Sequence, residues 1–461
     1  MKMSLNCTIL HNSLLAEQIK ISERLCSMVQ WVKYLNMAIF IVFCCCYAYQ
    51  LVYVGVRFVK KMPREPAKKL HKYAILIAAR NEANVIGELL DSIRHQDYPK
   101  DLIDVYVVAD NCTDNTAEVA RRHGVTVYER YNMQKVGKSY ALDFVFKQIK
   151  ESLGFGAYDG FMVFDADNVL DEHYVREINN VFDRGYRVVT SYRNSKNFGY
   201  NWISAGYAFW FLRESKYLNG ARMLCNTSCA ISGTGFLISS EIIAGDDGWK
   251  YNLLTEDIEF TVDKVIHNEV IGYCETAVLY DEQPVDFKAS WNQRMRWTKG
   301  FYQVTWKYGR KLLHGCLTGK GFQCFDMLMT IAPATLLTLA LLVVNIFAVG
   351  YGVYTDHIRV AAVAMTEIWM SIRNVYGSLF FFGLITVISE WKQIYCAPHK
   401  KLLYLFTFPI FMYTYIPIAV VALFKQVRWE PIQHSFAQTV AEIRRQDAVE
   451  NPITCEQRSH L

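Results

Sequence analysis

Four polar groups between positions 165 and 297 stand in a fixed order, and three of them carry the side chains that one group-transfer reaction needs. Asp165 and Asp167 form a carboxylate pair that can hold a divalent cation on a diphosphate. Asp257 in a second acidic cluster can accept a proton from a hydroxyl group, and Arg296 with Trp297 can grip phosphate and stack on a sugar. Together they predict transfer from a charged nucleotide donor. The full order is Asp165, Ala166 and Asp167; Ser232, Gly233, Thr234 and Gly235; Thr255, Glu256 and Asp257; Gln293, Arg294, Met295, Arg296 and Trp297.

Each group also has a plain structural interpretation. Exposed acidic pairs are usually just solvated, and the acids after Thr255 can cap a helix whose dipole favours negative charge. Gln293, Arg296 and Trp297 are three and four residues apart, so they share one helical face with Arg294 turned away. Such a face can also anchor a helix at a membrane interface. The fixed order of the groups favours chemistry over these alternatives.

The segment that carries these groups has the pattern of an α/β domain. Between about positions 72 and 309, short apolar runs alternate with amphipathic stretches. We expect strands at 73–79, 104–109 and 161–164, and a helix at 85–95. The last strand delivers the carboxylate pair to the carboxyl edge of the sheet, where a ligand of an open parallel sheet is expected.

The composition predicts a soluble domain joined to membrane segments. Of the 461 residues, 52% are hydrophobic and 20% are charged, which is too apolar for one ordinary soluble domain. Runs at 34–56, 327–355 and 402–424 carry no formal charge, and each exceeds the ~20 residues that a membrane helix needs. A shorter run at 374–389 predicts a fourth span. The expected regions are an N-terminal segment at 1–33, a transmembrane helix at 34–57, the α/β domain with a terminal interfacial helix at 70–315, transmembrane helices at 325–424 and a polar tail at 425–461.

The charge distribution predicts a membrane-surface protein with no nucleic-acid partner. The net charge of +5 is small, and the basic residues cluster beside the apolar runs instead of forming a stripe with interleaved aromatics. Six basic residues follow the first run between Arg57 and Lys69, so the positive-inside rule places the α/β domain in the cytoplasm of a multi-pass protein of the cell membrane. Lys401 and Lys425 both favour the inner side, however. This conflict requires that 402–424, interrupted by Pro409 and Pro417, is re-entrant or that another span exists.

The ordered motifs resemble those of membrane-embedded family 2 glycosyltransferases, the group of cellulose, chitin, hyaluronan and poly-N-acetylglucosamine synthases. The resemblance covers roughly residues 72–306 and implies a GT-A type nucleotide-sugar transferase domain. It implies that Asn81, Glu82 and the acidic turn from Asp110 to Thr116 cradle the uridine of a UDP-sugar, and that Lys138 is the basic residue before the next helix.

The same resemblance assigns the reacting groups. Asp165 would contact the diphosphate, Asp167 would ligate Mg²⁺ or Mn²⁺, and Asp257, next to Glu256, would be the general base. Gln293 and Arg296 would hold the diphosphate while Trp297 forms the acceptor floor. The loop at 232–236 departs from several relatives. No gating sequence like that of the cellulose synthases is found, and Trp429 with His434 is the substitute that the tail offers.

These observations predict a metal-dependent, inverting hexosyltransferase that extends a β-linked polysaccharide at the lipid bilayer and exports it. One base and one displacement imply inversion. An accessory export subunit is a further partner that such an enzyme can take. Two alternatives stay open: transfer of a single sugar to a lipid acceptor, and a non-enzymatic membrane protein that senses nucleotide-sugars.

Overall fold

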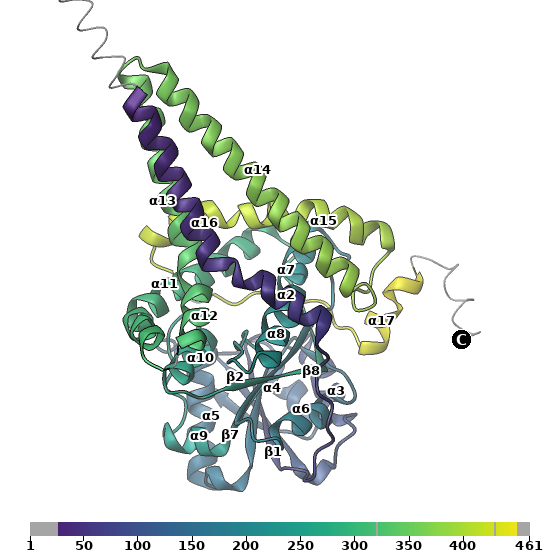
Figure 1. The fold of residues 1–461 in the computed structure, drawn as a ribbon. Coiled ribbons are helices and arrows are strands. Elements are labelled where there is room, and N and C mark those ends of the chain that lie inside the picture. Colours follow the sequence, from purple (N-terminus) through teal and green to yellow (C-terminus); the bar gives the residue numbers. More distant parts are fainter. Residues whose placement is uncertain (1–25, 320, 428–429, 450–461) are drawn as a thin grey trace, which may run out of the picture. The chain divides into compact units, whose positions relative to one another are not determined.

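The computed structural model describes residues 26–319, 321–427 and 430–449 (Figure 1). The chain divides into two compact units, Met1–Tyr49 with Pro333–Ser378, and Gln50–Ala332 with Leu379–Leu461. The predicted N-terminal segment up to residue 25, Trp429 and the end of the tail from residue 450 lie outside the described residues. The second unit contains all the predicted site residues.

The second unit is built around an eight-stranded mixed sheet with the order β3-β2-β1-β4-β7-β6-β8-β5. The strands β3, β2, β1 and β4 are parallel, whereas β7 is antiparallel to both of its neighbours. β8 runs parallel to β6 and antiparallel to β5. The bounds are β1 Tyr73–Ala79, β2 Ile103–Asp110, β3 Thr126–Arg130, β4 Gly160–Asp165, β5 Val169–Leu170, β6 Val188–Ser195, β7 Phe236–Ser239 and β8 Ile271–Asp281.

The parallel half of the sheet brings the predicted donor residues to one edge. β1 is an almost fully buried apolar strand, as expected for a strand covered on both faces. Ala78 pairs with Asp165 and Ala79 pairs with Ala109, so β1, β2 and β4 end side by side. The sequence prediction for these strands is confirmed to within one residue at each end.

Helices cover this sheet and carry the rest of the site. α5 packs on β1 and β2, and α6 packs on β6 and β8. α10 packs on α11, which in turn packs on α12. The bounds are α3 Ile86–Arg94, α4 Thr116–Arg122, α5 Lys138–Ser152, α6 Tyr174–Phe182, α7 Trp202–Arg213, α8 Gly220–Leu224, α9 Ser240–Gly245, α10 Glu256–Ile266, α11 Phe287–Leu317 and α12 Gly321–Ile331, with short 3-10 helices at Lys100–Leu102 and Phe155–Ala157 and a π-helix at Glu214–Asn219.

The last helices of the second unit pack on the α/β domain. α15 (Pro398–Tyr413) packs on α7, and α16 (Tyr415–Phe424) packs on α11. Arg294 is fully buried and donates from Nη1 to the carbonyl oxygen of Phe411 (3.3 Å) and to the hydroxyl of Thr414, where the two helices meet. The guanidinium therefore satisfies polar groups at this break. A short helix, α17 (Val440–Val449), lies within the tail.

The first unit consists of helices only, within the described residues. It contains the helix that begins at Cys26, α13 (Pro333–Tyr354) and the first part of α14 (Ile358–Ser389). Asn36 and Asn345 exchange two side-chain hydrogen bonds of 3.1 and 2.7 Å. This pair satisfies two buried amides in an otherwise apolar contact that includes Val32 and Ala348.

Four helices of the described residues are long and apolar enough to cross a membrane: Cys26–Val59, Leu336–Tyr354, Ile358–Ser389 and Pro398–Phe424. Two of them begin earlier than the runs at 34–57 and 374–389. The sequence argument ended each run at a charge, whereas a charged residue such as Lys33 interrupts hydropathy without ending a helix.

Candidate active site

The ends of β1 and β2 form two turns that bind each other. Asn81 has a positive φ of 57°, and its side-chain oxygen accepts a hydrogen bond from the backbone of Thr113 (2.8 Å). The backbone N–H of Glu82 donates to the hydroxyl of Thr116 (2.9 Å). Asparagine tolerates this left-handed conformation better than most residues, so the turn is locally specified. The structure thus brings the two predicted uridine-binding turns together.

Asp110 lies buried at the end of β2, where it forms an ion pair with Arg130 and accepts a bond from the Asn111 amide (3.0 Å). Arg130 in turn donates to the carbonyl oxygen of Lys135 (2.7 Å). The carboxylate of Asp110 therefore fixes the shape of this edge. The sequence prediction placed Asp110 correctly but did not identify Arg130 as its partner.

Asp165 and Asp167, at the end of β4 and just after it, contact different neighbours. Asp165 forms an ion pair with Lys138, whose ammonium group also donates to the carbonyl oxygen of Gly233 (2.8 Å). The backbone N–H of Asp165 donates to the Thr234 hydroxyl (2.9 Å). Lys138, at the start of α5, therefore joins the carboxylate to the loop at 232–235.

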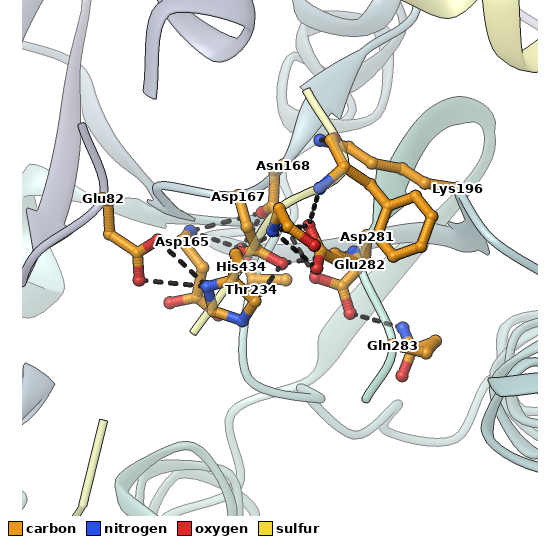
Figure 2. A network of polar contacts seen from close by, with 12 residues as sticks. Glu82, Asp165, Asp167, Asn168, Lys196, Thr234, Asp281, Glu282, Gln283 and His434 are labelled. Carbon is orange, nitrogen blue, oxygen red and sulfur yellow. Dashed lines mark hydrogen bonds and ion pairs between the residues drawn. The ribbon is translucent and has the colours of Figure 1, made fainter. Parts of the chain in front are cut away.

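Asp167 is buried and faces the tail of the chain (Figure 2). One of its oxygens accepts the backbone N–H of Glu282 (3.2 Å) and lies 3.9 Å from Nε2 of His434. Burial and the neighbouring Asp281 raise the pKa of Asp167 well above its usual range. Asp281 instead keeps a lowered pKa despite its burial, because it forms an ion pair with Arg193. A buried carboxylate of this kind gains from a positive group beside it.

The tail supplies that positive group. Nδ1 of His434 lies 3.0 Å from both carboxylate oxygens of Glu82. Burial lowers the pKa of His434, but Asp167, Glu82 and Glu282 outweigh it and raise the pKa to about 10. The imidazole therefore joins a predicted uridine-binding residue to a predicted metal ligand. The sequence prediction included neither Glu282 nor this contact among the site residues.

Backbone contacts hold the tail in this position. The carboxylate of Glu282 accepts the N–H groups of Ser435 (3.0 and 3.2 Å) and Phe436 (2.9 Å). The ammonium group of the buried Lys196, which Figure 2 shows near Glu282, donates to the Phe436 carbonyl oxygen (3.4 Å). A segment far along the chain thus lies over the carboxylates of the donor edge.

Glu256 and Asp257 begin α10 beside the loop at 232–235. A carboxylate oxygen of Asp257 lies 3.9 Å from the position that a Cβ on Gly233 would take. Burial raises the pKa of Asp257, although backbone groups of Ile258 and Gly233 and the charges of Lys138 and Arg296 lower it. Burial and Asp257 raise the pKa of Glu256 to about 7. The charge of one acid therefore affects the pKa of the other.

The loop that separates the two carboxylate groups requires glycine. Gly233 and Gly235 have positive φ angles of 77° and 67°. A Cβ on Gly235 would lie 1.9 Å from a methyl carbon of Leu279, so a larger residue would displace β8. Because this loop contacts both Lys138 and Asp257, it sets the distance between the donor edge and the acid pair.

The predicted face of α11 points at this region. Nη1 of Arg296 donates to the Leu254 carbonyl oxygen (3.4 Å), just before the acid pair. Within the described chain, the side-chain oxygen of Gln293 is buried and has no hydrogen-bond partner. A buried oxygen of this kind is rare in a native structure unless water or a ligand satisfies it. Trp297 meets the rings of Tyr207 (5.6 Å) and Phe211 (6.1 Å) edge to face.

Glu214 is a further candidate that the sequence prediction missed. It follows Phe211 by three residues and opens the π-helix, and its carboxylate accepts a hydrogen bond from the Ser232 hydroxyl (3.3 Å). Burial raises the pKa of Glu214, which Arg222 and Arg193 partly offset, and Asp257 adds to the increase. The π-helix turns this carboxylate toward the loop at 232–235; such bulges are frequent at functional sites.

The predicted metal ion requires donor atoms from nearby side chains. Among the described residues, no group of three or more His, Cys, Asp or Glu side chains forms a ready-made metal site. Mg²⁺ in nucleotide enzymes often takes only one or two carboxylates and completes its shell with phosphate and water. Asp165 and Asp167 fit that smaller donor set, and each already has a cationic side chain nearby.

Comparisons with known proteins support the fold described above. The profile of the family described as "Glycosyltransferase like family 2" matches residues 71–300. A solved mannosyltransferase from Pyrobaculum calidifontis, in complex with GDP-Man and Mn²⁺, has a similar fold, with a TM-score of 0.52 at 17% identity over 85% of this chain and 99% of that one. This likeness shows the fold, a GT-A type α/β domain with apolar helices.

Curated relatives are similar over the same region. The probable glycosyltransferase YdaM of Bacillus subtilis is 27% identical over 66% of this chain and 71% of its own length. The beta-monoglucosyldiacylglycerol synthase of Synechocystis is 25% identical over 51% of this chain and 49% of its own length. The poly-beta-1,6-N-acetyl-D-glucosamine synthase of Staphylococcus aureus is 26% identical over 53% and 58%. The match therefore spans about half the length of the two named synthases.

Proposed function

Because residues 71–300 form a family 2 glycosyltransferase domain, we propose that the protein transfers a sugar from a UDP-sugar to a hydroxyl group with inversion. The observation that carries the proposal is the loop at 232–235. Lys138 and Asp257 both contact this loop, which places a donor-side cation and a buried acid next to each other. An inverting displacement needs these two groups on opposite sides of one sugar carbon.

Asp257 is the proposed base. Its burial raises the pKa, which makes the carboxylate a better proton acceptor than an exposed aspartate. The nearby charges of Lys138 and Arg296 favour the ionised form and offset part of the effect of burial on this pKa. The acceptor hydroxyl gives its proton to this carboxylate as its oxygen bonds to the sugar carbon.

The leaving UDP gains negative charge in the same step. Arg296 and Gln293 lie on one face of α11, and the unpartnered oxygen of Gln293 marks a position that a ligand can satisfy. A planar guanidinium suits two diphosphate oxygens. A Mg²⁺ or Mn²⁺ ion held by Asp165 and Asp167 would offset further diphosphate charge. Stabilising the developing charge in this way is a large part of catalysis in such sites.

The acceptor side is proposed at Trp297 and Glu214, with the buried Tyr207 supporting the Trp297 ring. The Trp297 ring offers an apolar surface on which a sugar can lie, and the Glu214 carboxylate can accept hydrogen bonds from the hydroxyl groups of that sugar. This combination favours a carbohydrate acceptor. We propose a growing β-linked glycan, because the chain has more apolar helix than an anchor requires. Export of the glycan, with or without an accessory subunit, is part of this proposal.

A lipid acceptor is the second candidate. It is favoured by the similarity to the beta-monoglucosyldiacylglycerol synthase and by the packing of α15 beside the proposed acceptor rings, where Phe411 lies 5.0 Å from Tyr207. An apolar helix at this point could guide a lipid toward Trp297. The third candidate is a nucleotide-sugar sensor. Sensing does not require a general base such as the one proposed at Asp257.

The catalytic unit is proposed to face the cytoplasm in a multi-pass membrane protein. The conflict between Lys401 and Lys425 is resolved if α15 and α16 form a re-entrant pair, which their packing on α7 and α11 supports.

Product size separates the two acceptors. Purified protein is incubated with a panel of labelled UDP-sugars, with bilayer lipids present, and the products are sized. A ladder of long glycans supports the first proposal, and a monoglycosylated lipid at every donor concentration supports the second. Release of UDP without any glycosylated product contradicts both and favours the sensor.

A further inference from the structure

The second half of α11 has two exposed stripes that the proposed reaction does not use. Trp306, Leu313 and Leu317 form an apolar stripe at helical spacing, with Trp306 93% and Leu317 82% exposed. Beside it, a basic stripe follows the same spacing. Its members are Lys307, Arg310, Lys311 and His314, all of them exposed.

The orientation of this helix is fixed by its opposite face. Val304, Tyr308 and Leu312 are buried in a cluster with side chains of α10 and α12. Gly315 allows α11 and α12 to approach closely, because a Cβ there would lie 2.5 Å from the sulfur of Cys324. The exposed stripes are therefore not a part of the core that could turn inward.

An open groove of about 630 Å³ follows the basic stripe and Trp306, between the end of α10, α11 and α12. Its lining, as far as the chain is described, contains four basic side chains and no carboxylate. Lys307 is paired with the buried Glu259 (2.6 Å). In the structure as described, Arg310, Lys311 and His314 form no ion pair. The groove therefore carries uncompensated positive charge. The lining residues are Ile266, Trp306, Lys307, Arg310, Lys311, His314, Gly315, Thr318 and Cys324.

We propose that this groove binds the phosphate headgroup of an anionic membrane lipid. Arginine and lysine bind phosphate oxygens, and a tryptophan with leucines beside them suits the boundary between headgroups and acyl chains. A soluble anion would use the cations alone and leave the apolar stripe exposed to water. α12, which forms the other wall, leads in sequence directly to the candidate span Leu336–Tyr354. Both facts favour a lipid.

The headgroup site is separate from the proposed reaction. Arg310 lies about 20 Å along the helix axis from Arg296, since each residue of an α-helix rises ~1.5 Å. The lipid would nevertheless bind the same helix that carries Gln293, Arg296 and Trp297. Bound lipid would thus hold the catalytic unit at the bilayer surface in a fixed orientation.

Native mass spectrometry of the full-length protein in detergent tests the proposal. The protein is titrated with phosphatidylglycerol, with phosphatidylcholine and with soluble glycerol phosphate. The test variant is Arg310→Gln with Lys311→Gln and His314→Gln. The matched control is Arg121→Gln with Arg122→Gln and Lys147→Gln, which removes exposed basic groups of α4 and α5 that already have acidic partners.

The wild type and the control should bind phosphatidylglycerol more tightly than phosphatidylcholine, and the test variant should lose about fivefold in affinity for each of Arg310 and Lys311. Trp306→Gln should weaken phosphatidylglycerol binding without affecting glycerol phosphate. Equal binding of both lipids by the wild type, or an unchanged affinity in the test variant, overturns the proposal. Glycerol phosphate binding as tight as that of the lipid would assign the groove to a soluble anion. The headgroup site is separate from the proposed reaction. A wild type that shows no sugar transfer would therefore contradict the proposed function but not lipid binding in this groove.

Discussion

At the residue scale, the proposed chemistry depends on the environments that shift the pKa values of the acidic side chains. Asp257 and Glu256 have raised pKa values because they are buried, whereas Asp281 keeps a low pKa through its ion pair with Arg193. A raised pKa suits a group that must take up a proton, and a lowered one suits a group that organises its neighbours. The environments therefore separate a proposed base from a structural anion.

Replacing Asp257 with asparagine should reduce transfer by about 10²- to 10⁴-fold, because the amide keeps the shape but accepts no proton. Donor affinity should stay nearly unchanged. Turnover and UDP-sugar binding are measured on the same preparation. If more than about a tenth of the activity remains, Asp257 serves only as a helix-terminal acid.

The acid pair also predicts the pH dependence. Transfer should fall as the pH drops, because the proposed base must be ionised and burial raises the pKa of Asp257 above its ordinary value. The charge of Asp257 helps to raise the pKa of Glu256 to about 7, so Glu256 is protonated while Asp257 titrates, and Glu256→Gln should leave the acidic limb in place. The kcat profiles of both proteins check this. An acidic limb that moves to lower pH in Glu256→Gln would mean that Glu256 is charged while the base titrates.

Glu214 should matter for the acceptor and not for the donor. In Glu214→Gln the acceptor KM should rise by about tenfold or more, since a hydrogen bond to a charged group contributes about 1.5–3 kcal/mol. UDP-sugar affinity should not change. Glu259→Gln is the matched control, because it alters a buried glutamate that is bound to Lys307 and Leu253 away from the acceptor rings. A loss of stability in Glu214→Gln without a change in KM would make Glu214 structural.

At the scale of elements, local sequence predicted the strands but not the contacts between distant segments. β1 was predicted at its observed bounds and α10 at its observed start, because an apolar run and a cap with acids are local signals. The tail could not be placed this way, since His434 and Glu82 are 352 residues apart. Glu214 belongs to no motif, and its orientation depends on a π-helix that periodicity does not reveal.

The tail is proposed to compete with the metal ion. His434 occupies the approach to Asp167, so a cation must share or displace that contact. The imidazolium and the metal ion are both positive, so they compete for the carboxylate of Asp167. His434→Ala should therefore lower, by several-fold, the metal concentration that gives half-maximal transfer. Gln433→Ala is the neighbouring control. An unchanged metal requirement in His434→Ala would show that the tail and the ion use different space.

At the scale of the whole molecule, the catalytic unit and the membrane helices share elements. α11 begins in the proposed active site, packs on α12 and contacts the broken pair of α15 and α16. The composition correctly predicted both parts, because apolar runs and alternating patterns are separable in the sequence. The relation of α15 and α16 to the domain depends on Arg294, whose buried contacts with Phe411 and Thr414 need the folded structure to be seen.

The configuration of the new glycosidic bond tests the central claim most directly. The purified protein is given the UDP-sugar that it uses, which carries an α-linked sugar, and the anomeric proton of the product is recorded by NMR. Direct displacement with one base predicts a β-linked product that the wild type forms and Asp257→Asn does not. An α-linked product, or a β-linked product formed equally fast by Asp257→Asn, would contradict the account.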